Sequence, residues 1–495
     1  MRYYIGVDLG TSAMKLLLVN QNHEVVNSVT KAYDVSYPHP GWSEQNPEDW
    51  WNAFLAGIKE LTANIQTEDV DGLAVAGQMH GLVVLDDKDA VIRPTILWND
   101  GRTDKETAYL NDVIGKQTLS ERTANIAFAG FTAPKILWMK NNEPENYEKI
   151  AKIMLPKDYI NYRLTGVHAC DYADASGMLL LDVKNKCWSK AMLDICGITE
   201  AQMPKLFESY QSVGKVLPEV ATELGLRNDV TVAAGTGDNA AAAIGTATIG
   251  NGKCNISLGT SGTIFISAEK FGVDENNALH SFCHADGGYH LMGCILSAAS
   301  CNKWFCDEVL QTEDYAGEQK DITDTMLGNN EVFFLPYLMG ERSPINDTDA
   351  TGVFIGLRPN TTRKDMLLAV LEGVSFAVRD NIEVAKKLGI EIAQSTVCGG
   401  GAKSKLWMKI LCNILNIELQ IPQFEEGPGY GGALLAMCAC GVGETPKDLV
   451  DCKIKETIKP DAELVNRYQK KYKKFQMLYP NLKELYKEIK ENDYE

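Results

Sequence analysis

A repeated tetrapeptide offers the first candidate for chemistry. Leu-Gly-Thr-Ser occurs at Leu9–Ser12 and again at Leu258–Ser261, each time between two runs typical of β-strands. Glycine lets backbone N–H groups approach an anion closely, and threonine and serine hydroxyls add donors. One such turn is more simply a plain hairpin turn, but two that face one another would hold a triphosphate. The repeat therefore favours phosphate binding and an internally duplicated architecture.

Charged residues flank the first of these turns. Asp8 precedes it directly, and Lys15 lies in the run that follows. A carboxylate beside phosphates can hold Mg²⁺, directly or through water, because hard cations take oxygen ligands. Lys15 could reach the phosphates, although strand alternation equally makes it a surface residue. We predict that Asp8 is associated with Mg²⁺.

A third candidate is the string Gly-Thr-Gly-Asp-Asn-Ala at 235–240, which follows a strand-like run and opens an alanine-rich helix. It superficially matches a dinucleotide-binding fingerprint, but that motif needs an acidic residue about 20 positions further on. Residues 239–268 contain no Asp or Glu. Asp238 could simply cap the helix. Its alternative role is a general base that accepts the proton of a substrate hydroxyl.

Other familiar sites find less support. The Gly-Lys pairs are followed by Gln, Val and Cys, so no P-loop is present. A group of histidines and cysteines matches no usual zinc spacing and lies in what reads as paired strands. With so few histidines, no Ser-His-Asp triad can be picked out, and a hydrolase remains open only in principle. The group comprises His280, Cys283, His284, His290 and Cys294.

Length and composition set the frame for these residues. A chain of 495 residues exceeds one hydrophobic core, so we predict two domains, at 1–247 and 248–495. The net charge of −18 would repel a phosphate backbone, so nucleic acid is not an expected partner. No run of about 18 apolar residues suggests a membrane span, and the N-terminus lacks the features of a signal peptide. Thirteen scattered cysteines fit reduced core thiols, so we expect a soluble, cytoplasmic protein.

Strands and helices alternate between the two turns and after the second. We predict a hairpin at Tyr4–Asn20, a helix at Pro47–Leu61 and a strand at Gly72–Gln78. A short strand ending at Cys398 should run through three glycines into a helix from Ser404. The stretch after Asp461 reads as a solvated terminal helix. This order indicates mixed α/β layers that bring the turns to strand ends.

Longer strings resemble the FGGY carbohydrate kinases, members of the actin-like ATPase superfamily. Residues 130–142, GFTAPKILWMKNN, and residues 352–372 fit the two signatures of the family. The resemblance covers residues 4 to about 440. Further strings are similar to those of family members that phosphorylate D-xylulose: Gly41–Gln45, Gly77–Gly81, Ile96–Arg102, Leu155–Tyr159, Phe334–Tyr337 and Gly340–Arg342.

The resemblance implies an α/β fold of two duplicated actin-like ATPase (ribonuclease H-like) domains around a central cleft. It makes Asp238 the catalytic base and Asp8 the metal-associated acid, and it assigns sugar binding to the first domain and adenosine to the second. Met79, His80, Asp238 and Asn239 match sugar-contacting positions; a neutral imidazole such as that of His80 can both donate and accept a hydrogen bond. The implied ATP-binding residues are Thr11, Ser12, Lys15, Gly259, Thr260, Gly400, Gly401, Ala402 and Lys405, the last at a position where relatives often have Asn.

The implied activity is ATP- and Mg²⁺-dependent phosphorylation of D-xylulose to D-xylulose 5-phosphate in D-xylose catabolism. The resemblance also implies a homodimer. Two alternatives stay open. One is an FGGY kinase for another ketose or polyol, such as ribulose, glycerol or gluconate. The other is a non-sugar actin-like ATPase, which would need the two turns but not the Met79–His80 motif.

Overall fold

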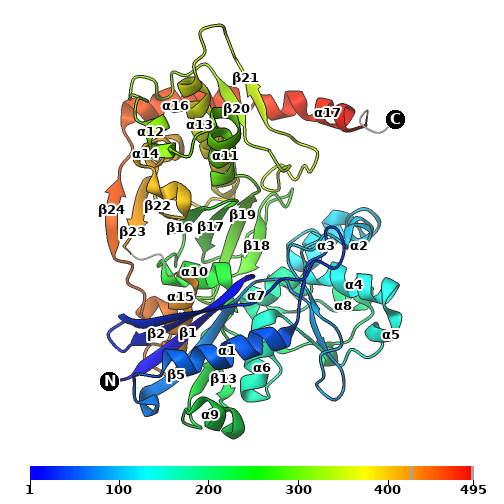
Figure 1. Ribbon diagram of the computed structural model, residues 1–495. Coiled ribbons are helices and arrows are strands. Elements are labelled where there is room, and N and C mark those ends of the chain that lie inside the picture. Colours follow the sequence, from blue (N-terminus) through cyan, green and yellow to red (C-terminus); the bar gives the residue numbers. More distant parts are fainter. Residues whose placement is uncertain (424–426, 492–495) are drawn as a thin grey trace.

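The computed structural model describes residues 1–423 and 427–491 and contains two seven-stranded mixed sheets flanked by helices (Figure 1). The first sheet has the order β13-β14-β5-β1-β2-β3, with β15 also paired to β5. Its strands are β1 (Tyr3–Leu9), β2 (Ala13–Asn20), β3 (Val25–Ala32), β5 (Val70–Gly77), β13 (Ser212–Lys215), β14 (Thr231–Ala233) and β15 (Thr236–Gly237).

The second sheet has the order β18-β19-β17-β16-β22-β23-β24. Its strands are β16 (Cys254–Leu258), β17 (Gly262–Ala268), β18 (His280–Cys283), β19 (Tyr289–Ile295), β22 (Gln394–Cys398), β23 (Glu418–Pro422) and β24 (Ile454–Ile458).

Both sheets are built on one scheme. β1 pairs antiparallel with β2 and parallel with β5, and β16 pairs antiparallel with β17 and parallel with β22. The next strand outward, β14 or β23, is again parallel. The predicted α/β class and its internal duplication are therefore confirmed, and each Leu-Gly-Thr-Ser turn joins the central antiparallel pair of its sheet.

Helices cover the apolar faces of both sheets. On the first sheet α1 (Pro47–Leu61) begins after Asn46, whose side chain accepts from the N–H of Glu48, and buries Trp50 and Phe54. On the second sheet the long α13 (Arg363–Lys387) packs against α14 (Lys405–Leu415). The predicted helices are confirmed, with α14 capped by Ser404, whose hydroxyl accepts from the N–H of Trp407.

A helix from the later part of the chain lies against the first sheet. α15 (Gly427–Ala439) packs on β1 and on α10 (Asp238–Gly245), and Figure 1 shows the two helices stacked between the halves of the molecule. A Cβ on Gly6 would lie 1.8 Å from the carbonyl oxygen of Gly429, so the backbones touch directly. The boundary at 247/248 stays a prediction, but α15 shows that the second part of the chain completes the packing of the first sheet.

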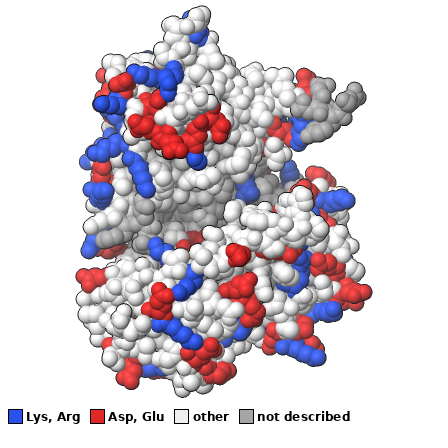
Figure 2. All heavy atoms as spheres, in the orientation of Figure 1, with Lys and Arg blue, Asp and Glu red and all other residues white. Residues whose placement is uncertain are grey.

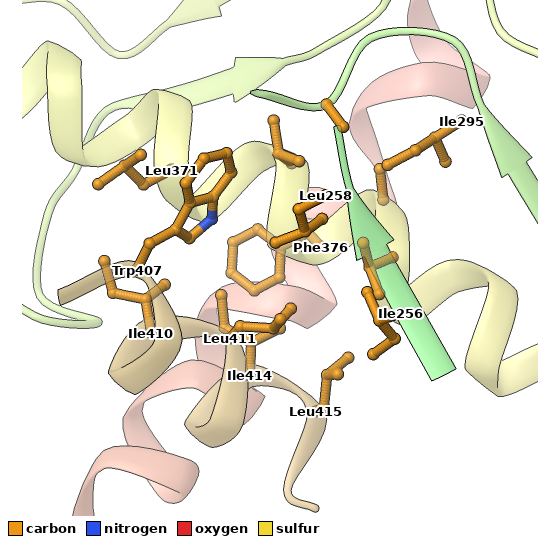
Figure 3. Close-up of a cluster of buried hydrophobic side chains, with 14 of the residues drawn as sticks. Ile256, Leu258, Ile295, Leu371, Phe376, Trp407, Ile410, Leu411, Ile414 and Leu415 are labelled. Atoms are coloured by element: carbon orange, nitrogen blue, oxygen red, sulfur yellow. The ribbon is translucent and has the colours of Figure 1, made fainter. Parts of the chain in front are cut away.

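A tight core supports the second turn from below. Figure 3 shows Trp407, Ile410 and Leu411 of α14 directed toward Leu258 of β16 and Phe376 of α13. The indole N–H of Trp407 donates to the hydroxyl of Ser375 at 3.1 Å, which satisfies the buried donor. The end of β16 is therefore held by packing from α13 and α14.

Two expectations need correction. The terminal helix α16 (Ala462–Phe475) is not simply solvated, because Tyr468 and Tyr472 are buried against α13 and Lys471 pairs with the buried Glu372. The cysteines are all free, and eight are buried, but Cys187 is exposed. Among the described residues no helix is long and apolar enough to cross a membrane.

Acidic and basic side chains intermingle over much of the face drawn in Figure 2, apart from an arc of acidic side chains on the half that carries the second sheet. With a net charge of −18, the molecule cannot attract an anionic nucleotide by its overall field. Nucleotide binding must therefore depend on local donors at particular turns.

Candidate active site

Three strands of the first sheet end side by side. Leu9 of β1 is in register with Gly77 of β5, and Gly77 is in register with Gly237 of β15, all parallel. The residues that follow these positions emerge at one edge of the sheet, which is where ligands bind in open α/β sheets. This edge brings together the first Leu-Gly-Thr-Ser turn, the Met79–His80 pair and Asp238.

Asp238 is the first residue of α10 rather than its cap. The N-cap is Gly237, and one Asp238 carboxylate oxygen accepts from the backbone N–H of Asn239 at 2.7 Å and from its side-chain amide at 3.0 Å. Burial raises the pKa of Asp238 to about 6, against those two hydrogen bonds, which lower it. Because Gly237 holds the N-cap position, the capping alternative is wrong. A carboxylate with a pKa just below neutral suits a general base.

Met79 and Asn239 connect the base to the neighbouring strand. The side-chain amide nitrogen of Asn239 lies 3.9 Å from the sulfur of Met79. A Cβ on Gly237 would stand 2.8 Å from Cγ of Met79, so the thioether packs directly on the strand that leads into Asp238. Three of the predicted sugar-contacting residues therefore share one surface.

His80 is held in a strained and defined position. Its backbone has φ of +69°, and its carbonyl oxygen accepts from Nζ of Lys135 at 2.9 Å and from Oγ1 of Thr132 at 3.1 Å. Its Nδ1 lies 2.8 Å from the carbonyl oxygen of Gly177. A carbonyl only accepts, so Nδ1 carries the proton.

The remaining nitrogen of His80 is therefore an acceptor. Burial, with the nearby charge of Lys135 as a second cause, lowers the pKa of His80 to about 3, which keeps the ring neutral. The sequence suggested a group that donates and accepts. The structure narrows this, because the donor is used internally and only Nε2 can receive a hydrogen bond from a ligand hydroxyl.

Side chains from distant segments fix the first turn. The hydroxyl of Thr11 donates to Oε1 of Gln78 at 3.2 Å, and the Thr11 carbonyl accepts from the amide of Gln45 at 2.6 Å. The indole N–H of Trp98 donates to the Thr11 hydroxyl at 3.0 Å. Ser12 is exposed at the end of the turn.

Asp8 and Lys15 stand opposite one another in the β1–β2 register, both half-buried beside this turn. The Asp8 charge contributes to a raised pKa of Tyr33, second to burial. One carboxylate next to a phosphate-binding turn fits Mg²⁺, which is commonly held by one or two carboxylates together with substrate phosphates and water. Asp8 is the residue that would hold it.

The second turn lies beside the glycines that the sequence predicts to bind adenosine. Ser257 of β16 is in register with Cys398 of β22, and a Cβ on Gly399 would stand 2.7 Å from the Leu258 carbonyl oxygen. Gly259 and Thr260 therefore lie beside the turn that contains Gly400, Gly401 and Ala402. Gly400 is exposed and open on its Cβ side, whereas Gly401 is buried against Leu258 and Trp407.

Lys405 is the exposed first residue of α14, and in the described part of the chain its side chain makes no hydrogen bond or ion pair. The histidines considered for zinc pack against aromatic rings: His280 stacks on Phe282 at 5.4 Å and His290 on Phe265 at 4.0 Å. No group of three metal-ligating side chains occurs among the residues that the structure describes.

Sequence reasoning missed a buried charge cluster beneath the site. Nζ of Lys157 lies 2.5 Å from Asp158, 3.0 Å from Asp171 and 3.9 Å from Asp174, all four fully buried. The cluster supports the strand ends, because Lys157 touches Gly77 and Asp174 touches Gly237. Only the string Leu155–Tyr159 hinted at it, and no spacing there indicated a cluster.

Known proteins share the sequence features of both halves of the chain. Family models of the FGGY carbohydrate kinases match the chain twice, the N-terminal domain at residues 3–245 and the C-terminal domain at residues 254–440. The chain belongs to the FGGY family of carbohydrate kinases. It is therefore a phosphotransferase of a family that acts on small carbohydrates with ATP.

Relatives within the family differ in how closely they match. The chain is 40% identical to the xylulose kinase of Escherichia coli (strain K12), over 97% of this chain and 99% of that one. A crystal structure from Brucella ovis, described as a "xyloylose kinase", superposes with a TM-score of 0.93 at 38% identity, covering 98% and 100% of the two chains. A gluconate kinase from Lactobacillus acidophilus reaches the same TM-score at 26% identity, with 99% of each chain covered. The fold is thus shared across kinases of different sugars, and a xylulose kinase from Lactobacillus acidophilus is also only 26% identical.

Proposed function

We propose that this kinase transfers the γ-phosphoryl group of ATP to the terminal hydroxyl of D-xylulose, giving D-xylulose 5-phosphate. The observation that carries the proposal is the junction of β5 and β15, where Asp238 and Asn239 lie against Met79 and beside His80. Xylulose kinases at 37–40% identity over nearly the full length support D-xylulose as the sugar.

In this proposal Asp238 accepts the proton of the attacking hydroxyl. Its raised pKa, about 6, leaves it mostly ionised at neutral pH yet basic enough to share the proton as the bond to phosphorus forms. Nε2 of His80 accepts from a second sugar hydroxyl, and Met79 packs against the carbon chain. These contacts orient the hydroxyl, because phosphoryl transfer depends chiefly on positioning and electrostatics.

The nucleotide would lie between the two turns. Thr11 and Ser12 offer hydroxyl and backbone donors from one side, Gly259 and Thr260 from the other, and the exposed Gly400 leaves room for adenosine. Mg²⁺, when bound beside Asp8, would supply charge neutralisation of the phosphates. Lys15 is close enough in the sheet to assist with the phosphates.

A sugar panel in a coupled ADP-release assay tests the substrate. We expect kcat/KM to be highest for D-xylulose among D-xylulose, D-ribulose, glycerol and D-gluconate, with ADP release low when no sugar is present. A higher value for another sugar would overturn the assignment, and ADP release that ignores sugar would indicate a non-sugar ATPase. In the same assay Asp238→Asn should lower kcat roughly 100-fold or more, at the scale of general-base contributions.

The free cysteines also support a reducing compartment, and we propose the cytoplasm, where ATP is available. The homodimer stays a prediction.

A further inference from the structure

One arginine in the second half of the chain differs from the rest. Five arginines follow residue 248, and four of them pair with a glutamate: Arg358 with Glu331, Arg363 with Glu318, Arg379 with Glu383 and Arg467 with Glu463. Arg342 forms no ion pair with any described residue, although it is half-buried. A guanidinium carries five donors, and leaving them without an acceptor away from water costs free energy.

The backbone of Arg342 is firmly placed. One oxygen of the buried Glu341 carboxylate accepts from the N–H of Leu296 at 2.9 Å and from the N–H of Arg342 at 2.8 Å. The N–H of Ser343 donates to the carbonyl of Cys294 at 2.9 Å. This segment is therefore fixed against the end of β19, and the direction of the Arg342 side chain is set by the second sheet.

The side chain reaches residues of the first half of the chain. Its Cζ lies 5.0 Å from the ring centre of Phe128, which contacts Phe131, and Phe131 lies 4.7 Å from the ring of His80. The Arg342 charge contributes to the lowered pKa values of His80 and His280. The pKa of Asp238, in contrast, is set by burial and by Asn239. The Arg342 charge thus acts on His80, and the Cys294 thiol lies within range of the charges of both Arg342 and Asp238.

Among the residues that the structure describes, the side-chain acceptor bonded to the guanidinium is the thiol of Cys294, which is a weak one. A ligand that spans Asp238 and His80 would supply better acceptors. His80 offers only an acceptor to that ligand and Arg342 only donors. A sugar hydroxyl would donate to His80, and a hydroxyl or carbonyl oxygen would accept from Arg342.

We propose that Arg342 is a sugar-binding residue, which donates hydrogen bonds to oxygens at the end of the sugar remote from the phosphorylated hydroxyl. This inference deepens the function proposed above and rests on it. It also means that the sugar is held by both halves of the molecule, by His80 from the first and Arg342 from the second. Correct sugar would then draw the two halves together.

Kinetics of Arg342→Met and Arg342→Lys test the proposal. Met keeps an unbranched stem over Phe128 and removes every donor, while Lys restores the charge without the fork. Met should raise KM for D-xylulose about 10- to 100-fold, the scale of hydrogen bonds to a charged group, with Lys between Met and the parent. KM for ATP and kcat should change less than about threefold, because a contact made equally in ground and transition states affects KM alone.

A matched control is Arg358→Met, which removes an exposed arginine of the same half and should leave both KM values unchanged. An unchanged KM for D-xylulose in Arg342→Met, or an equal rise in both KM values, would overturn the proposal. Thermal unfolding without ligand detects misfolding. The rise in Tm that a fixed concentration of D-xylulose produces should be smaller in Arg342→Met than in the parent and unchanged in Arg358→Met. If the parent prefers another sugar, the substrate assignment fails, and Arg342 is then judged by the same split measured with that sugar.

Discussion

The two Leu-Gly-Thr-Ser turns have the same backbone plan but different surroundings. Asp8 and Lys15 flank the first, and in the same alignment Ser257 and Ile264 flank the second. Side chains from distant segments bind the first turn. The second turn is held mainly by backbone groups: the N–H of Ala298 donates to the Thr260 carbonyl at 2.9 Å and the N–H of Ala299 to the Gly259 carbonyl at 2.8 Å, with one added bond from the Ser300 hydroxyl.

The two copies of a duplicated turn can therefore have different roles. A hairpin turn supplies phosphate-facing donors on both sides, so the tetrapeptide itself does not determine the role of either turn. Charged side chains flank only the first turn, and its side-chain ties come from segments distant in the sequence, whereas the second turn lies beside the glycines at 399–401. In the proposed function, chemistry would therefore be concentrated in one half of the molecule and nucleotide binding in the other.

The largest effect is expected from removing the charge beside the first turn. Asp8→Asn should lower kcat roughly 100-fold, because a charge beside metal and phosphates contributes several kcal/mol. Its counterpart Ser257→Ala should change kcat less than about threefold, since the second turn carries no charge to lose. Steady-state kinetics of both variants check this, and equal losses would show that the two turns are functionally equivalent.

A pH profile separates the base from both turns. With its pKa raised to about 6, Asp238 becomes protonated as the pH falls below 6, so kcat/KM should drop about tenfold per pH unit there. The folded-state pKa lies above 3.8, the ordinary value of an aspartate, so protonation favours the folded protein. The loss should therefore occur without unfolding at this group, which circular dichroism can verify. A flat profile between pH 7 and 5 would contradict the assignment.

Gly400 tests the nucleotide side. Its Cβ position is open, so Gly400→Trp should fold normally yet fill the space left for adenosine. ATP at 100 times its Kd should stabilise the parent by about 2.7 kcal/mol, and this shift should vanish in the variant while Gly400→Ala keeps it. Gly401 is less suitable, because a Cβ there would stand 2.8 Å from Cβ of Leu258 and disturb the core. An undiminished Tm shift in Gly400→Trp would place adenosine elsewhere.

The smallest effects are expected from removing single hydrogen bonds to the two turns. Gln78→Ala removes a buried acceptor of the Thr11 hydroxyl and should lower the free energy of unfolding by about 1–3 kcal/mol. Ser300→Ala removes a hydrogen bond to the Thr260 carbonyl near the surface and should cost about 0.5 kcal/mol. Urea unfolding measures both losses. Equal losses in the free energy of unfolding would contradict the difference between the two turns.

The sequence predicted those features that depend on interactions between residues close together in the chain. Both hairpins and the bounds of α1 depend on neighbours in the chain, and the patterns predicted them correctly. The ties of Thr11 to Gln45, Gln78 and Trp98 span tens of residues, and no local pattern indicates them.

Long-range partners also explain the sequence predictions that were wrong. The terminal helix looked solvated because the partner of Lys471, Glu372, lies 99 residues away. The capping alternative for Asp238 could be excluded only from the structure, which places Gly237 at the N-cap of α10. The buried lysine with its carboxylates was missed since polar residues in sequence are by default assigned to the surface.

The docking of α15 on the first sheet bears on how the chain is made. During synthesis on the ribosome the first sheet emerges early, but the helix that covers Gly6 and Leu17 is translated only after more than 400 residues. Until then this apolar face of the nascent chain, which includes Tyr4, Val19 and Ala74, lacks its native cover. The interval is one in which chaperones would engage the growing polypeptide, and a truncated product ending at residue 245 would expose the same surface permanently.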